Sequence, residues 1–242
     1  MREPARRAAI LSEKNVSVEQ APSRRIHASA ERYGNLLDHY YLMSLPLDYE
    51  PGPEKRLDVV ATRTGQSMEA VYYDHLVQGD GRQFAAYFAQ NYGNGDLSET
   101  RDMLSNPIVR LGLADGGAHL QLSCDGALPS FQLIHWARDR KRGPALPLEH
   151  VVRQLTADNA ALYSMNDRGT LAVGKRADIN VIDFDNLSLD LPTMLFDLPE
   201  GGKRLLQFSK GYVATLVNGV VTRRDDQDTG ARPGRLYRSK LA

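Results

Sequence analysis

The feature that most constrains the fold is a change in pattern near residue 168. Before it, segments with helical periodicity alternate with short apolar segments: a helix is predicted at residues 67–79, a strand at 83–93, a helix at 97–106 and a strand at 108–115. Strands that alternate with helices usually pair in parallel, because each helix crosses over the sheet between two strands. This order favours a parallel α/β arrangement.

After that change the pattern is mostly that of β-structure. Residues 179–184 are rich in strand-forming residues, and residues 211–225 contain two β-branched runs joined by Asn218-Gly219, a strong hairpin signal. We therefore expect two domains, an α/β part at residues 1–168 and a β-rich part at residues 169–242.

Further helices are predicted from their end signals. Residues 55–65 form a short helix that ends at Gly65, and Ser67 is a candidate N-cap for the helix that follows. Residues 129–143 begin at a proline and end in cations and a glycine, as helix dipoles prefer. Residues 147–164 carry an apolar stripe that predicts one buried face.

Asp115 is the first candidate for a functional residue. It ends the predicted strand at 108–115, and ligands bind at the carboxyl ends of strands in parallel α/β sheets and barrels. Gly116 and Gly117 allow the backbone to turn sharply there. The carboxylate could bind a metal or accept a proton from water, or it could simply form a turn. His119, four residues on, is either a site residue or a polar loop residue.

The other reactive residue types give weaker signals. Cys124 is the single cysteine, so no intrachain disulfide and no thiolate metal cluster are expected. His135 and Trp136 lie in a predicted amphipathic helix and are expected to pack, and the cationic run at 138–143 is expected to be a solvated helix end. No phosphate-binding loop, dinucleotide fingerprint or nucleophile elbow occurs. The remaining histidines lack metal-ligand spacing such as His-x-His: His27, His39, His75 and His150.

Composition excludes several classes of partner. Thirty basic residues balance thirty acidic residues, so no net field favours nucleic acid or an anionic membrane. No apolar run approaches the roughly 20 residues of a membrane span. The first residues lack the apolar core of a signal peptide, so we expect a cytoplasmic protein.

Three segments together resemble the C-terminal half of metal-dependent amidohydrolases, and most closely the N-acyl-D-amino-acid deacylase (D-aminoacylase) group. The ADI-x-VID motif and the VNG hairpin recur across many amidohydrolases, whereas DGGAH together with TGARPGRLYR is narrower and favours the deacylase group. The resemblance extends from about residue 50 to the end. Its segments are GLADGGAH at 112–119, TADNAALYSMNDRGTLAVGKRADINVID at 156–183 and YVATLVNGVVTRRDDQDTGARPGRLYR at 212–238.

The resemblance implies a fold and a chemistry. The fold is a TIM-like (β/α) barrel, of which this chain would hold the last three units, followed by part of a small β-sandwich. Residues 84–92 would be the seventh strand, and Asp115 would end the eighth. The resemblance implies Zn²⁺ as cofactor and an N-acyl amino acid as substrate. It makes Asp115 the general base and a candidate metal ligand, and places His119 in the substrate pocket.

Two departures from the family pattern change the expectation. Ala114 stands where the family commonly has serine before the base. The family's His-x-His pair, bridging ligand and mid-barrel histidines have no counterpart in this sequence, and a whole barrel typically takes about 250 residues. We therefore expect a chain that corresponds to the C-terminal half of an amidohydrolase, and whether it is active alone stays open. Such a chain would arise from an internal start in the gene model, a decayed gene or a split subunit.

Two other readings of the function stay open. One is a different amidohydrolase chemistry, such as a cyclic amidase or a dihydroorotase-like reaction. The other is a non-catalytic fragment or interaction module. In either case a partial barrel would expose strand edges and apolar faces, so we expect self-association.

Overall fold

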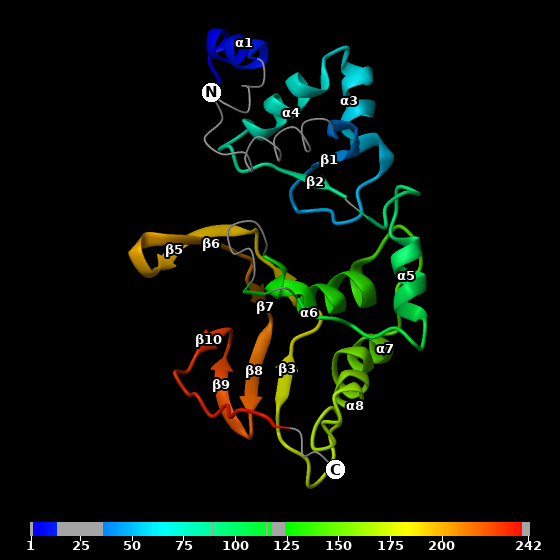
Figure 1. The fold of residues 1–242 in the computed structure, drawn as a ribbon, viewed down its shortest axis with the longest axis vertical. Helices are drawn as coiled ribbons and strands as arrows, with labels where there is room; N and C mark the ends of the chain where they lie inside the picture. The colour runs from blue at the N-terminus through cyan, green and yellow to red at the C-terminus, as the bar shows by residue number, and fades with distance from the viewer. Residues whose placement is uncertain (1, 14–35, 89, 115, 118–123, 239–242) are drawn as a thin grey trace. The chain divides into compact units, whose positions relative to one another are not determined.

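The computed structural model describes residues 2–13, 36–88, 90–114, 116–117 and 124–238. The chain divides into two compact units, Met1–Thr100 and Arg101–Ala242, and the division falls inside helix α5 (Ser98–Ser105). Figure 1 traces both units. Among the residues that the structure describes, every helix is too short or too polar to cross a lipid bilayer.

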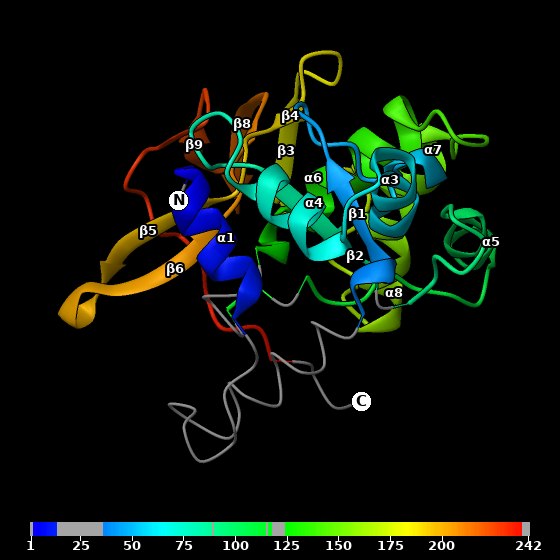
Figure 2. The ribbon, with the colours of Figure 1, turned by 90° about the horizontal axis from the view of Figure 1, so that it is seen from above.

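The first unit packs two helices beside a two-stranded antiparallel sheet (Figures 1 and 2). Tyr40 pairs with Tyr87 across the sheet, and their rings lie 5.2 Å apart. The elements of this unit are α1 (Pro4–Ser12), β1 (Tyr40–Met43), α3 (Leu57–Thr64), α4 (Met68–Leu76) and β2 (Phe84–Tyr87), with 3-10 turns at Leu37–His39 and Pro53–Lys55.

Local signals explain where α3 and α4 begin and end. The Ser67 hydroxyl accepts a hydrogen bond from the Ala70 N–H at 3.2 Å, which confirms it as the N-cap of α4. Gly65 ends α3 with φ of 66°, a left-handed conformation that favours glycine. Both helices bury one face in a cluster formed by Leu57, Ala61 and Val71. The predicted helices in this part of the chain are therefore confirmed.

The second unit joins two helical runs to an antiparallel β-region. Helix α6 continues into a π-helical segment at Gln132–Asp139, and α7 continues through a second π-helical segment at Gln154–Asp158 into α8. Its other elements are α6 (Leu128–Phe131), α7 (Leu148–Arg153), α8 (Asn159–Leu162), β3 (Ile179–Ile182), β4 (Ser188–Leu189), β5 (Thr193–Leu198), β6 (Gly202–Leu206), β7 (Ser209–Lys210), β8 (Tyr212–Val217), β9 (Val220–Arg224) and β10 (Gln227–Asp228), with 3-10 turns at Asp125–Ala127 and Pro199–Gly201.

The β-rich character predicted for the end of the chain is confirmed. A four-stranded sheet has the order β10-β9-β8-β3, and β5 and β6 form a separate hairpin that extends from it (Figures 1 and 2). Asn218 and Gly219 have φ of 52° and 79°, the pair of positive values that a type I′ hairpin turn requires. The domain boundary near residue 168 stays a prediction.

The predicted parallel order differs from what the structure shows. Strand β2 is shorter than predicted and pairs antiparallel with β1, and the described strands form no closed barrel. Residues 108–114 form no strand, and Ile108 and Leu113 are 86% and 80% exposed. A strand requires a hydrogen-bonding neighbour, and in the described residues none lies beside this segment.

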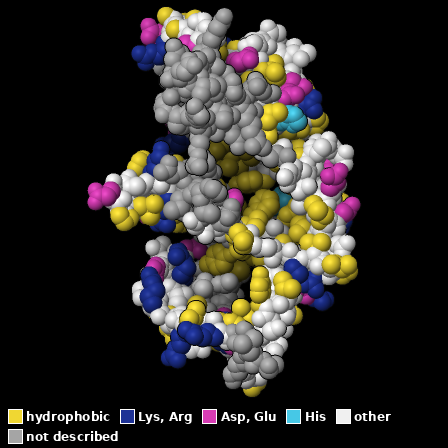
Figure 3. Space-filling model, in the orientation of Figure 1, with side chains coloured by type: hydrophobic (Ala, Val, Ile, Leu, Met, Phe, Trp, Pro, Cys, Tyr) yellow, Lys and Arg dark blue, Asp and Glu magenta, His cyan; other side chains and the backbone are white. Residues whose placement is uncertain are grey.

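Apolar side chains also reach the surface elsewhere in the second unit. The stripe predicted for residues 147–164 is only partly buried: Val151 is fully buried, whereas Val152 and Leu162 are exposed. Leu171 and Val173, in the loop before β3, are among the most exposed apolar residues described. Figure 3 shows hydrophobic side chains at the surface.

Arg138 connects the π-helical segment Gln132–Asp139 to the loop that follows β3 through hydrogen bonds. Its guanidinium donates to the carbonyl oxygens of Phe184, Asp185 and Leu187 and to the carboxylate of Asp139. It also lies 5.6 Å from the Phe184 ring centre.

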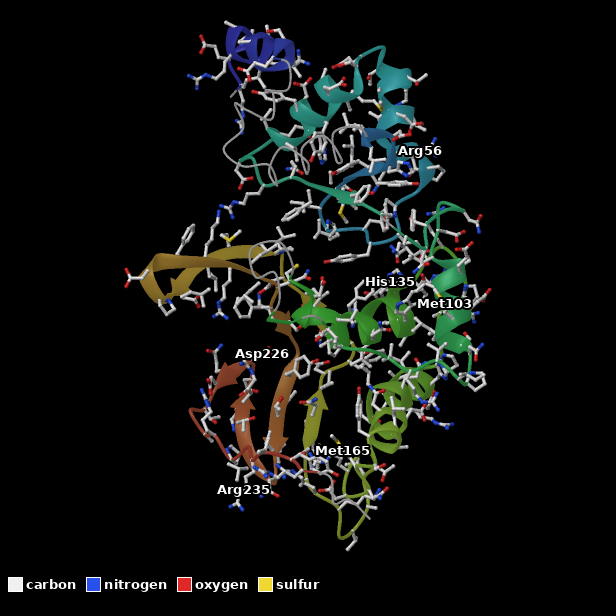
Figure 4. The ribbon with its side chains drawn as sticks, in the orientation of Figure 1. Arg56, Met103, His135, Met165, Asp226 and Arg235 are labelled. Carbon is white, nitrogen blue, oxygen red and sulfur yellow. The ribbon has the colours of Figure 1, made fainter. Side chains whose placement is uncertain are left out.

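We expect Arg138→Gln to lower the free energy of unfolding by about 2 kcal/mol, because charge-assisted hydrogen bonds to partly buried carbonyls would be lost. Urea unfolding followed by circular dichroism measures this. Arg235→Gln is the control, since Arg235 is exposed in the C-terminal tail (Figure 4) and should change the free energy by less than about 0.5 kcal/mol. Equal losses in the two variants would contradict a role for Arg138 in joining these segments.

Candidate functional site

The two candidate site residues, Asp115 and His119, lie outside the described residues. The structure does describe the glycines that follow Asp115. A side chain at Gly116 would meet the Gly126 Cα at 3.5 Å, and Gly117 has φ of 110°, where a side chain would be strained. The contact at Gly116 is an ordinary van der Waals distance, so only Gly117 requires glycine, for the sharp bend that the sequence predicts at this point.

Cys124 follows this segment and is half-buried. Burial, and then the neighbouring carboxylate of Asp125, raise the pKa of the Cys124 thiol. Nucleophilic cysteines have a lowered pKa because the thiolate is the reactive form. The surroundings of Cys124 therefore favour the thiol and oppose a role as nucleophile.

The described histidines lie on separate elements. The Nε2 atom of His75 is 2.8 Å from the Phe84 carbonyl oxygen, and that of His150 is 2.9 Å from the Leu104 carbonyl oxygen. His39 is exposed beside Asp38. His135 is 8% exposed and stacks on Phe131, so the prediction that it packs is confirmed.

These residues do not fit a zinc site. Zinc in proteins takes three or four His, Cys, Asp or Glu ligands. In the described residues no three such side chains come together where a metal ion could bind.

The ADI motif at residues 177–179 and the VNG motif at residues 217–219 contact each other where β3 begins and β8 ends. The carboxylate of Asp178, from the ADI motif, accepts the Asn218 N–H of the hairpin turn at 2.8 Å. The Gly219 N–H donates to the Ala177 carbonyl at 2.9 Å. Arg176 and Arg168 also donate to the Asp178 carboxylate, at 2.8 and 3.1 Å. The ADI and VNG motifs therefore have a structural role here, which spacing in the sequence does not reveal.

Burial raises the pKa of Asp178, but the hydrogen bonds from Arg176 and from the Asn218 N–H lower it by more, so its pKa lies below the ordinary value. A carboxylate whose folded pKa is lowered stabilises the fold above its unfolded pKa, about 3.9, and loses that contribution as pH falls through the folded value.

We expect Asp178→Asn to be less stable than the unaltered chain by a constant amount above about pH 5, with a gap that narrows below about pH 4. Thermal unfolding from pH 3 to 7 measures this. Asp225→Asn is the control, because Asp225 is exposed in the turn between β9 and β10 and its carboxylate has no hydrogen bond or ion pair among the described residues. A gap that stays constant down to pH 3 would show that the Asp178 charge does not stabilise the hairpin.

A pocket in the first unit was not predicted from the sequence. It has a volume of about 450 Å³ and brings Glu54, Arg63 and His75 together with the apolar side chains of Leu42 and Val60. Its residues come from β1, the 3-10 turn at Pro53–Lys55, α3, α4 and the segment before β2. No spacing in the sequence connects such distant positions.

The comparisons with known proteins decide the family. A model of the amidohydrolase family matches residues 68–223, most of the chain. The chain belongs to the amidohydrolase family. Members of this family are hydrolases and typically depend on a metal ion. No curated protein and no solved structure matches the chain.

Proposed function

We propose that this amidohydrolase chain acts in hydrolysis of the amide bond of N-acyl amino acids, with a preference for the D configuration. The observation that carries the proposal is the family match over residues 68–223, which includes the DGGAH segment and both the ADI and VNG motifs. The narrower substrate class rests on DGGAH together with TGARPGRLYR at residues 229–238.

The proposal includes the corresponding fold. Residues 1–168 would contribute the last three units of a TIM-like barrel, and residues 169–242 would contribute part of a β-sandwich. The antiparallel sheet formed by β3, β8, β9 and β10 supports the second assignment. A cytoplasmic location and self-association through exposed apolar segments also belong to the proposal.

Asp115 is the proposed general base. Its carboxylate removes a proton from a water molecule whose oxygen attacks the acyl carbon. The C–N bond of the resulting tetrahedral intermediate then breaks, and Asp115 passes the proton to the leaving amine nitrogen. The products are a carboxylate and a free amino acid. His119 is the proposed neighbour of the substrate in this pocket.

Zinc is the metal that the resemblance implies for this chemistry. The described residues do not supply its ligands. The zinc content of the purified chain is therefore to be measured. A content of about one zinc ion per chain would mean that side chains outside the described residues bind the metal.

The experiment that tests the proposed function is an assay of the 242-residue chain with several N-acetyl-D-amino acids, their L enantiomers, a hydantoin and dihydroorotate. Turnover of the N-acetyl-D-amino acids, at least tenfold faster than of the L forms, would support it. Turnover of the cyclic amides alone would support a cyclic amidase instead.

A non-catalytic amidohydrolase module is the second candidate function. The exposure of Ile108 and Leu113, in a segment that forms no strand, favours it. A catalytic base must be held within about 0.5 Å of its working position, which requires a well-packed support. Absence of turnover with every substrate, in the presence of added zinc, would favour this candidate.

A further inference from the structure

The pocket in the first unit is a hollow that is wide open to solvent, and its volume is that of a small-molecule site. Ligand pockets usually occupy about 300–1,000 Å³ and combine apolar walls with a few polar groups. This one has a volume of about 450 Å³. It is formed by Leu42, Met43, Ser44, Leu45, Glu54, Lys55, Val60, Arg63, His75, Gln78 and Gln83.

Part of the pocket wall is held in place by the core of the unit. Leu42 and Val60 pack against the buried cluster of Leu57, Ala61 and Val71. His75 is fixed by its contact with the Phe84 carbonyl oxygen, at 2.8 Å. An apolar group of a ligand would therefore meet a surface that exists before binding.

The charged groups of the pocket differ in what they already contact. The Lys55 ammonium donates to the Ser44 hydroxyl at 3.0 Å and lies 3.7 Å from the Asp48 carboxylate. By contrast, Arg63 and Glu54 have no ion pair or side-chain hydrogen bond among the described residues, and both are exposed. The Glu54 carboxylate lies over Gly52: a Cβ atom added at Gly52 would be 2.2 Å from the Oε2 atom of Glu54.

We propose that this pocket binds a free α-amino acid with an apolar side chain. The Arg63 guanidinium binds the carboxylate, for which its planar fork of donors is suited. The Glu54 carboxylate binds the ammonium group, and the side chain lies against Leu42 and Val60. Arg63 and Glu54, which have no partner in the part of the chain that the structure describes, match a ligand with one charge of each sign. Because both groups are exposed, the dissociation constant is expected to be on the order of 1 mM.

The test is ligand-observed NMR titration of the whole chain with leucine, N-acetylleucine and leucinamide. N-acetylleucine lacks the ammonium group, and leucinamide lacks the carboxylate. We expect leucine to bind at least fivefold more tightly than either. Equal binding of all three, or no binding of leucine up to about 20 mM, would overturn the proposal.

Three variants assign the contacts. Arg63→Gln is expected to weaken the binding of leucine at least fivefold and to leave the binding of leucinamide unchanged. Glu54→Gln is expected to weaken the binding of leucine and to leave the binding of N-acetylleucine unchanged. Arg6→Gln is the control, because Arg6 is an exposed arginine on α1 outside the pocket. The proposal fails if Arg63→Gln binds leucine as Arg6→Gln does. The titration measures no hydrolysis, so its outcome is independent of the proposed function.

Discussion

Replacement of Asp115 by asparagine is expected to lower the rate of N-acyl-D-amino-acid hydrolysis by about 10³-fold. Asparagine has nearly the shape of aspartate but cannot take a proton from water. The measurement is kcat/KM for an N-acetyl-D-amino acid, with circular dichroism to show that the variant folds as the unaltered chain does. The loss should appear in kcat, since a base acts in the transition state and not in binding the substrate.

Asp125→Asn is the matched control for this variant. Asp125 is an exposed aspartate ten residues further along, at the start of a 3-10 turn. Its replacement is expected to change kcat/KM less than about threefold. If Asp115→Asn retained activity within that same range, the general-base role would be wrong and any turnover would need another base.

Trp136→Ala is expected to have the largest effect on stability, a loss of about 3–5 kcal/mol. Trp136 is 2% exposed and is one of the largest fully buried side chains described. Its ring meets His135 edge-on and lies 5.0 Å from the Arg140 guanidinium carbon, and its carbonyl accepts the Leu146 N–H at 2.7 Å. Alanine would leave a large cavity between these partners.

Urea unfolding followed by far-UV circular dichroism measures this loss, because Trp136 is the chain's single tryptophan and its fluorescence disappears with it. Val173→Ala is the control, since Val173 is fully exposed and should change the free energy by less than about 0.5 kcal/mol. A loss below about 1 kcal/mol for Trp136→Ala would mean that the second unit is loosely packed around this ring.

The residues of the candidate site were only partly predictable from the sequence. The choice of Asp115 depends on its place after an apolar run and on the resemblance to deacylases, and it stays a prediction. The contacts of Asp178 with Arg168 and with the hairpin turn were not predicted, because they join residues that are 10 and 40 positions apart in the sequence. The same holds for the pocket that contains Glu54 and Arg63.

By itself, the sequence determined the features that depend on a few neighbouring residues. Ser67 caps its helix with its own hydroxyl, Gly65 adopts the left-handed conformation that ends a helix, and Asn218-Gly219 forms a tight hairpin turn. Each follows from the chemistry of one or two side chains and the backbone beside them.

Only the tertiary structure decided how strands pair. An apolar run has the same composition whether it joins a parallel sheet, joins an antiparallel sheet or finds no partner. Residues 84–87 pair antiparallel with β1, and residues 108–114 form no strand. A strand is stabilised by hydrogen bonds to a neighbour distant in the sequence, so its own residues do not specify that neighbour.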